Sequence, residues 1–150
     1  MSSGFDPHDH SACVSGAIAQ AEAADIRLTP VRRRVLEILL ESHTAMGAYD
    51  VLARLRDEGL GDQPPVAYRA LSFLVDNGLA HRIERLNAFV ACARPGAEHD
   101  PAFMICRSCR TVAEAASPAT LDRMADDSGF AIERTVIEAE GLCPKCQVPA

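Results

Sequence analysis

Six cysteines are the residues best able to carry chemistry in this 150-residue sequence, and four of them form two pairs. Cys106 pairs with Cys109 and Cys143 with Cys146, each in the spacing Cys-x-x-Cys. That spacing lets both sulfurs of a pair reach one tetrahedral ion, and two pairs complete the four-thiolate shell that zinc prefers. We therefore predict a closed structural zinc site that joins the last strand of the chain to an earlier hairpin.

The alternative for these cysteines is a redox site of the thioredoxin kind. Such a site needs one Cys-x-x-Cys pair that opens a helix after a strand. Two pairs fit that arrangement poorly, so structural zinc is the favoured interpretation.

A second and less regular set of potential metal ligands lies in the middle of the chain. Its members are His81, Cys92, His99 and Glu114. If a hairpin turn is centred on Leu86-Asn87, His81 lies directly opposite Cys92, and opposed side chains on one face are close enough to share an ion. A metal held by all four residues would connect the two halves of the chain.

The charges of this second set suit a divalent ion. Cys92 as a thiolate and Glu114 as a carboxylate supply two negative charges, and the imidazoles of His81 and His99 are neutral. One thiolate, two imidazoles and one carboxylate favour zinc over magnesium or manganese. The alternative is a solvated or core histidine beside a small buried cysteine. A third cluster, His8, Asp9, His10 and Cys13, lies in and directly after a predicted mobile tail (1–12), where incidental metal affinity is the simpler interpretation.

The elements that must position these residues are segments with helical spacing and segments with strand-like alternation. Together they predict an α+β fold. Residues 14–24 and 48–58 have helical spacing, Thr29 and Pro30 are typical of a helix start, and a further helix runs from Pro65 to Gly78. Strands over 79–84 and 89–92 follow. This order predicts a winged helix-turn-helix over residues 1–92.

The remainder of the chain predicts a hinge and a second, smaller domain. Arg94–Glu98 is typical of a hinge, which we place at 93–100. Beyond it we expect strands at 103–106 and 111–115, a helix over 118–128 capped by Ser117, and a strand over 131–139. We predict that residues 101–150 form a small α/β dimerisation domain held by the structural zinc.

Side chains on the outer face of the helix after Pro65 are candidates for reading DNA. Tyr68, Arg69 and Ser72 lie there, in the helix that enters the groove in this class of fold. Arg32 and Arg33, with Arg34, cluster at an earlier helix start and are candidates for phosphate contacts. The alternative for any one arginine is a solvated surface charge.

Composition sets limits on where the protein acts. The net charge is −6, but residues 26–85 carry nine Arg against eight Asp or Glu, so a local basic face remains available.

The sequence contains neither an apolar run long enough to span a membrane nor a secretory signal, so we expect a cytoplasmic protein whose thiols stay reduced.

Several segments together resemble the ferric uptake regulator family, and most of all its zinc uptake regulator branch. They are Arg27–Arg32, Ala48–Asp50, Pro64–Leu71, Phe103–Cys109 and Val136–Cys143. The resemblance implies a homodimeric, zinc-responsive repressor that binds inverted-repeat DNA operators of zinc-uptake genes. It also implies two zinc ions per chain, a structural one on the four paired cysteines and a regulatory one on His81, Cys92, His99 and Glu114, and it adds Tyr49 to the DNA-binding candidates.

The sequence departs from the family at two positions. Iron-type members have a histidine-rich run near the hinge, whereas here only His99 stands there, which with Cys92 argues against iron. Val66 stands where the family usually has Thr at the start of the reading helix, so one capping or phosphate contact is expected to be missing or replaced.

Three other functions compete with a zinc-gated repressor. A sensor of iron, manganese or nickel is the nearest, and the thiolate ligand argues against the harder ions but not against nickel. A zinc hydrolase or deaminase would need an open site and an H-x-E partner, which the sequence lacks, so we do not expect an enzyme. A zinc-ribbon interaction module would not explain the helix-turn-helix.

Overall fold

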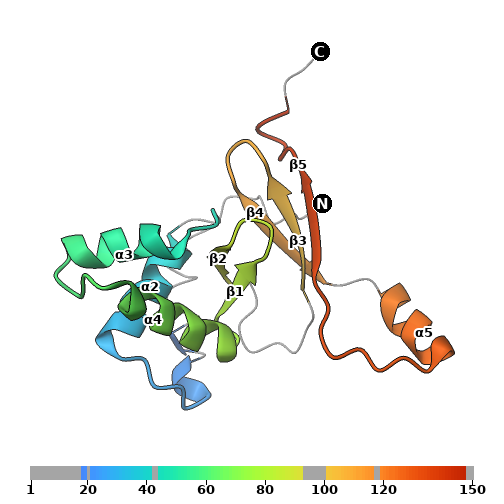
Figure 1. The fold of residues 1–150 in the computed structure, drawn as a ribbon, viewed down its shortest axis with the longest axis horizontal. Coiled ribbons are helices and arrows are strands. Elements are labelled where there is room, and N and C mark those ends of the chain that lie inside the picture. Colours follow the sequence, from blue (N-terminus) through green and yellow to red (C-terminus); the bar gives the residue numbers. More distant parts are fainter. Residues whose placement is uncertain (1–17, 20, 42–43, 93–100, 117–118, 148–150) are drawn as a thin grey trace.

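The computed structural model describes residues 18–19, 21–41, 44–92, 101–116 and 119–147. The predicted tail, the tail metal cluster, the hinge, His99 and Ser117 lie outside these residues. Residues 18, 19 and 21–23 are helical, which agrees with the part of the predicted 14–24 helix that is described. Figure 1 shows a helical half at one side, a three-stranded sheet beside it and a helix that projects from the far side.

The helices α2, α3 and α4 make up most of the described first half, and local signals fix where the first two begin. The α2 helix spans Pro30–Leu40, with the Thr29 hydroxyl accepting the N–H of Arg32 at 3.4 Å. The α3 helix spans Ala48–Asp57, and the Asp50 carboxylate accepts the N–H of Gly47 at 3.2 Å. Both contacts satisfy backbone donors that a helix start leaves without partners inside the helix.

The α4 helix, Pro64–Asp76, is the predicted reading helix. It begins one residue earlier than expected, and Gln63 at its N-cap makes no side-chain capping hydrogen bond. Val66 packs on Gly61, where an added Cβ would lie 2.9 Å from its Cγ1. Gly78 ends the helix at φ +73°, a conformation that glycine adopts without a steric penalty.

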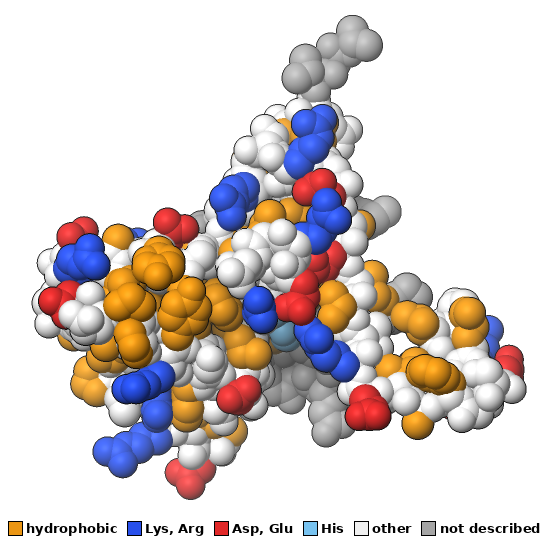
Figure 2. Space-filling view, viewed as in Figure 1, with side chains coloured by type: hydrophobic (Ala, Val, Ile, Leu, Met, Phe, Trp, Pro, Cys, Tyr) orange, Lys and Arg blue, Asp and Glu red, His pale blue; other side chains and the backbone are white. Residues whose placement is uncertain are grey.

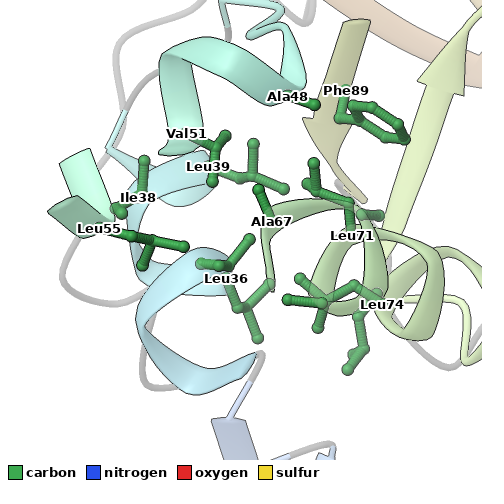
Figure 3. Packing of buried hydrophobic residues seen from close by; sticks show 14 of the residues in the cluster. Leu36, Ile38, Leu39, Ala48, Val51, Leu55, Ala67, Leu71, Leu74 and Phe89 are labelled. Atoms are coloured by element: carbon green, nitrogen blue, oxygen red, sulfur yellow. The ribbon is translucent and has the colours of Figure 1, made fainter. Parts of the chain in front are cut away.

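The apolar stripes of these helices meet in one core, drawn in Figure 3. Leu36 and Leu39 of α2 face Val51 and Leu55 of α3, and Leu71 of α4 closes the centre. Each of these side chains is at most 2 % exposed. Burying a leucine or valine contributes roughly 1.5–3 kcal/mol, so this core holds the helix-turn-helix together.

A two-stranded wing follows α4. The β1 strand, Ala80–Ile83, pairs antiparallel with β2, Ala88–Ala91, through a four-residue turn at 84–87. A single antiparallel bridge between Met46 and Phe89 extends this sheet on the β2 side. The winged helix-turn-helix expected from the sequence is therefore present.

The second half is a three-stranded sheet in the order β4-β3-β5. The β3 strand, Pro101–Cys106, pairs antiparallel with β4, Val112–Ala116, and parallel with β5, Ile137–Gly141. The α5 helix, Ala119–Ser128, connects β4 to β5 and projects away from the sheet (Figure 1). No described helix is long and apolar enough to cross a membrane.

The predicted strand over 131–139 was partly wrong. Only residues from Ile137 onward form a strand, because pairing starts where Ile137 meets Ala102 near the beginning of β3. Residues 131–136 alternate in polarity but have no strand beside them in the described chain, and they form an extended connection.

A second apolar cluster joins the wing to this sheet. Ile83, Ala88 and Val90 of the wing pack with Phe103, Ile105 and Val112 of β3 and β4, and Ala45 completes the cluster. The N–H of Ala45 also donates to the carbonyl of Arg110 at 3.2 Å. The two halves therefore share a continuous, partly apolar joint.

Candidate metal centres and DNA-binding face

The four paired cysteines lie together at one end of the sheet. Cys106 ends β3 and Cys109 lies in the turn that follows, while Cys143 and Cys146 lie in the turn after β5. Because β3 and β5 are parallel, both turns leave the sheet at the same end. All four sulfurs are within 4.8 Å of one another, as the spacing predicted.

The geometry of the four sulfurs fits a zinc ion. Tetrahedral Zn–S bonds of about 2.3 Å place two sulfurs roughly 3.8 Å apart, and the sulfurs of Cys109 and Cys143 are 3.7 Å apart. Backbone N–H groups of Cys109 and Cys143 lower the pKa of the Cys106 thiol to about 6. The neighbouring sulfurs raise the pKa of Cys146 to about 12, so four thiolates at this spacing require a cation.

A second cluster contains three of the four ligands predicted for the regulatory site. His81 lies on β1, Cys92 directly follows β2 and Glu114 lies on β4, and their ligand atoms are within 4.8 Å of one another. The His81 Nε2 is 3.4 Å from the Glu114 Oε1, and the Cys92 Sγ is 3.9 Å from the Glu114 Oε2. The cluster therefore draws on the wing and on the C-terminal sheet.

The hairpin register behind that prediction was wrong. His81 pairs with Val90 rather than with Cys92, and Ile83 pairs with Ala88. The turn is centred one residue earlier than expected, between Arg85 and Leu86, which displaces the pairing by two residues. An even displacement leaves each side chain on its original face, so His81 and Cys92 remain neighbours on a diagonal.

The surroundings of this second cluster suit an ion of intermediate hardness. The Glu114 side chain is 4 % exposed and that of His81 is 17 % exposed, and the ring of Phe103 lies edge-on to His81 at 5.3 Å. A carboxylate this buried is costly without a positively charged or hydrogen-bonding partner. Imidazole, thiolate and carboxylate together fit zinc. The fourth predicted donor, His99, lies outside the described residues.

The expected DNA-binding residues of α4 lie on its exposed face. Arg69 and Ser72 are exposed, and Tyr68 is 42 % exposed. The ring of Tyr49, at the start of α3, meets that of Tyr68 edge-to-face at 6.4 Å. Tyr68 and Ser72 also line a groove of about 390 Å³ between α4 and the wing. The arrangement presents one continuous surface from α3 to the wing.

The arginines at the start of α2 divide into different environments. Arg33 is exposed and is 3.5 Å from Glu37. Arg34 is held in a network on α2 and α3, with bonds of 2.6 and 3.1 Å to the Glu58 carboxylate. Its guanidinium therefore binds carboxylates of the protein, which does not support the prediction that Arg34 contacts a phosphate.

Arg32 has a partner that the sequence did not indicate. Its guanidinium carbon lies 3.7 Å from the centre of the Phe73 ring on α4, and its Nη1 donates to the carbonyl of Arg27 at 3.1 Å. Glu138 was also missed, although its carboxylate contacts the turn of the wing. Contacts between residues so distant in sequence have no spacing that could reveal them.

Comparison with known proteins agrees with these features. No family model matches the chain. The chain is 39 % identical to the zinc uptake regulation protein of Escherichia coli (strain K12) over 139 residues, which cover 86 % of this chain and 80 % of that protein. A zinc uptake regulator solved in complex with zinc and DNA superposes with a TM-score of 0.81 at 35 % identity, over 93 % of this chain and 96 % of that one.

Two forms of one other regulator, XcZur, differ in their likeness to this chain. The holo form superposes with a TM-score of 0.78 at 34 % identity, over 92 % of this chain and 98 % of that one. The apo form reaches only 0.54 at 35 % identity, over 92 % of this chain and 97 % of that one. Over the whole chain, the structure is thus more similar to the holo form than to the apo form of that regulator. With this identity over most of its length, the chain belongs to the zinc uptake regulator branch of the ferric uptake regulator family.

Proposed function

We propose that this protein is a zinc-responsive transcriptional repressor that acts as a homodimer in the cytoplasm and has no catalytic role. The observation that carries the proposal is the cluster of His81, Cys92 and Glu114, whose donor atoms come from the wing and from the C-terminal sheet. An ion bound there would favour the arrangement in which the two halves are docked. Zinc occupancy would thereby control the orientation of the DNA-binding face.

Two zinc ions per chain are part of the proposal. The four cysteines supply the structural ion, which contributes to folding. His81, Cys92 and Glu114, with His99 as the expected fourth ligand, supply the regulatory ion. Moving a conformational equilibrium from 1:99 to 99:1 requires about 5.5 kcal/mol of differential binding. Structural zinc sites reach roughly 10–16 kcal/mol, so even a weaker regulatory site could supply this difference.

Unpartnered apolar side chains support a dimer formed by the C-terminal half. Met124 is 62 % exposed on α5, Phe130 just beyond it is 71 % exposed and Val136 is 48 % exposed. Figure 2 shows apolar side chains gathered over the projecting α5. Large apolar side chains this exposed are typical of an interface. A second copy of this chain would cover it and pair the two winged helices for an inverted repeat.

The proposed DNA-binding surface consists of Arg69, Tyr68 and Ser72 on α4, Tyr49 on α3, and Arg32 and Arg33 on α2. The support for this surface is the exposure of Arg33, Tyr49, Tyr68, Arg69 and Ser72, together with the likeness to a regulator solved with DNA. In this proposal Arg69 contacts a guanine edge or a phosphate, Tyr68 contacts a phosphate or a thymine methyl, and Arg32 and Arg33 contact phosphates.

One experiment tests the whole proposal. Zinc per chain and binding to a labelled inverted-repeat duplex are measured together across a buffered zinc series, with nickel and manganese in parallel. We expect two zinc ions per chain and duplex binding that appears with the second. Duplex binding that is equal at one and two zinc ions, or that follows nickel at lower free concentration, would contradict zinc regulation.

A further inference from the structure

The turn of the wing is held by a carboxylate from the other half of the chain. The Oε2 of Glu138 accepts the backbone N–H of Glu84 at 2.6 Å, and its Oε1 accepts that of Arg85 at 2.9 Å. Both oxygens of one carboxylate therefore bind two successive N–H groups. Hydrogen bonds to an ionised acceptor are stronger than neutral ones.

Ion pairs flank this contact on both sides. Arg134 donates to the Glu84 carboxylate at 2.7 Å, and Arg85 lies 3.3 Å from Glu140. Hydrogen bonding to Arg134 lowers the pKa of Glu84, which keeps that carboxylate ionised. Figure 2 shows acidic and basic side chains gathered where the wing meets the C-terminal sheet. We call Glu84, Arg85, Arg134, Glu138 and Glu140 the wing-turn contact.

The wing-turn contact and the second metal cluster attach the same strand at two places. His81 near the start of β1 approaches Glu114 on β4, whereas the turn just after β1 is bound by Glu138 on β5. Three to four residues of strand separate the two attachments by about 10 Å. A cavity of about 260 Å³ lies between them, lined by His81, Phe103 and Glu138 among others. Together with the apolar cluster that Ile83, Ala88 and Val90 form with the sheet, these two attachments fix the direction of the wing.

We propose that Glu138 is a positioning residue for DNA binding: it fixes the wing turn on the C-terminal sheet and adds a metal-independent contribution to the docked arrangement. It is neither one of the proposed metal ligands nor one of the proposed DNA-contacting residues. This inference rests on the proposed function of a repressor gated by metal-dependent docking. Glu138 would thereby set how much zinc is needed to reach the DNA-binding arrangement.

The expected effect follows from a two-state equilibrium. When only the docked arrangement binds operator, a lower docked fraction raises the apparent dissociation constant for zinc in proportion. Losing charge-assisted hydrogen bonds at this partly exposed site should shift the half-maximal zinc concentration by roughly tenfold. At saturating zinc, operator affinity should stay within about twofold of the parent, because the DNA-binding face is unchanged.

The experiment compares Glu138→Gln with Glu133→Gln in the full chain. Gln has the shape of Glu but no charge, and it offers one acceptor in place of two. Glu133 is exposed on the segment that precedes β5, so its substitution makes the same charge change away from the wing turn. For each protein we measure zinc per chain, binding of an inverted-repeat duplex selected on the zinc-loaded parent, and amide hydrogen exchange at residues 84 and 85.

We expect Glu138→Gln to keep two zinc ions at saturation, to need roughly tenfold more zinc for half-maximal duplex binding, and to exchange faster at both amides. Glu133→Gln should behave as the parent. An unchanged zinc midpoint in Glu138→Gln, or unchanged exchange at residues 84 and 85, would overturn the inference.

Two further outcomes remain decisive. If the parent itself shows no zinc-dependent duplex binding, the proposed function fails, and faster exchange at the two amides still decides whether Glu138 holds the turn. If Glu138→Gln does not fold, Arg134→Gln replaces it, since Arg134 is 70 % exposed. That variant should move the zinc midpoint in the same direction by a smaller factor, and an unmoved midpoint would overturn the inference.

Discussion

His81 and Glu114 approach within 3.4 Å, although one lies on the wing and the other on the C-terminal sheet. The thiol of Cys92 lies 3.9 Å from the same carboxylate. An ion bound between these residues would connect the C-terminal sheet to the DNA-binding half.

Cys92→Ser should separate the two proposed metal sites. It removes a thiolate ligand and one negative charge from the second cluster and leaves the four paired cysteines intact. We expect a folded dimer with one zinc per chain and without zinc-activated operator binding. The measurement is metal content with operator affinity across a buffered zinc titration. A variant that loses one zinc but still responds as the parent does would show that this cluster is not the sensor.

Cys106→Ser should damage folding rather than only sensing. Three thiolates cannot complete the shell, and the turn after β3 then loses its connection to the turn after β5. We expect an insoluble or monomeric product that is sensitive to chelators. A stable dimer with the melting temperature of the parent would contradict the structural assignment.

Arg69→Ala should weaken specific DNA binding while both zinc ions and the dimer remain. Losing a good base contact costs about 1–3 kcal/mol. Arg56→Ala is the control, because Arg56 is an exposed arginine in the last turn of α3. Affinities are measured at one fixed salt concentration. Equal operator affinity in the parent and Arg69→Ala would remove Arg69 from the base-reading role.

Phe73→Leu should weaken DNA binding through Arg32. The ring lies against the guanidinium, and an exposed cation–π contact contributes about 0.5–1 kcal/mol. We expect a two- to fivefold loss of affinity. If Arg32 no longer holds a phosphate, the slope of log K against log salt concentration should become less steep by up to about 0.9. Phe73→Tyr keeps an aromatic ring at this position and should leave both quantities as in the parent. If Phe73→Leu weakens binding further in an Arg32→Ala background, the two residues do not act together.

Glu41→Gln should destabilise the winged helix at neutral pH but not in acid. Two 2.8 Å hydrogen bonds from Arg54 lower the pKa of Glu41 below 4.5. A carboxyl with a depressed pKa stabilises the fold above its unfolded pKa, and this contribution disappears as the pH falls through the folded pKa. For so exposed a pair we expect about 0.2–1 kcal/mol at neutral pH. A parent–variant difference in unfolding free energy that persists at about pH 3 would contradict this cause.

The sequence predicted most of what has local causes. Thr29 and Pro30 predicted the start of α2, and Gly78 predicted the end of α4. The two Cys-x-x-Cys spacings predicted the four-sulfur cluster. The second cluster could be predicted despite a wrong register, because strand side chains alternate and a displacement by two residues returns His81 to the same face.

What the sequence could not predict depends on distant partners. The alternation over 131–139 gave no sign that a neighbouring strand would be present only from Ile137 onward. The stack of Arg32 on Phe73 and the contact of Glu138 with the wing turn join residues that no motif spacing connects.

The apolar cluster between the wing and the sheet limits how far the DNA-binding half can be studied alone. In the whole chain Ile83, Ala88 and Val90 are 0 %, 0 % and 4 % exposed, and part of their cover is Phe103, Ile105 and Val112. A fragment cut after residue 92 would place that face of the wing in water, at roughly 25 cal/mol for each Å² of apolar surface uncovered. Such a fragment would be less stable and more prone to aggregate than its helices alone suggest, so a weak DNA affinity measured on it would reflect an uncovered wing rather than poor recognition.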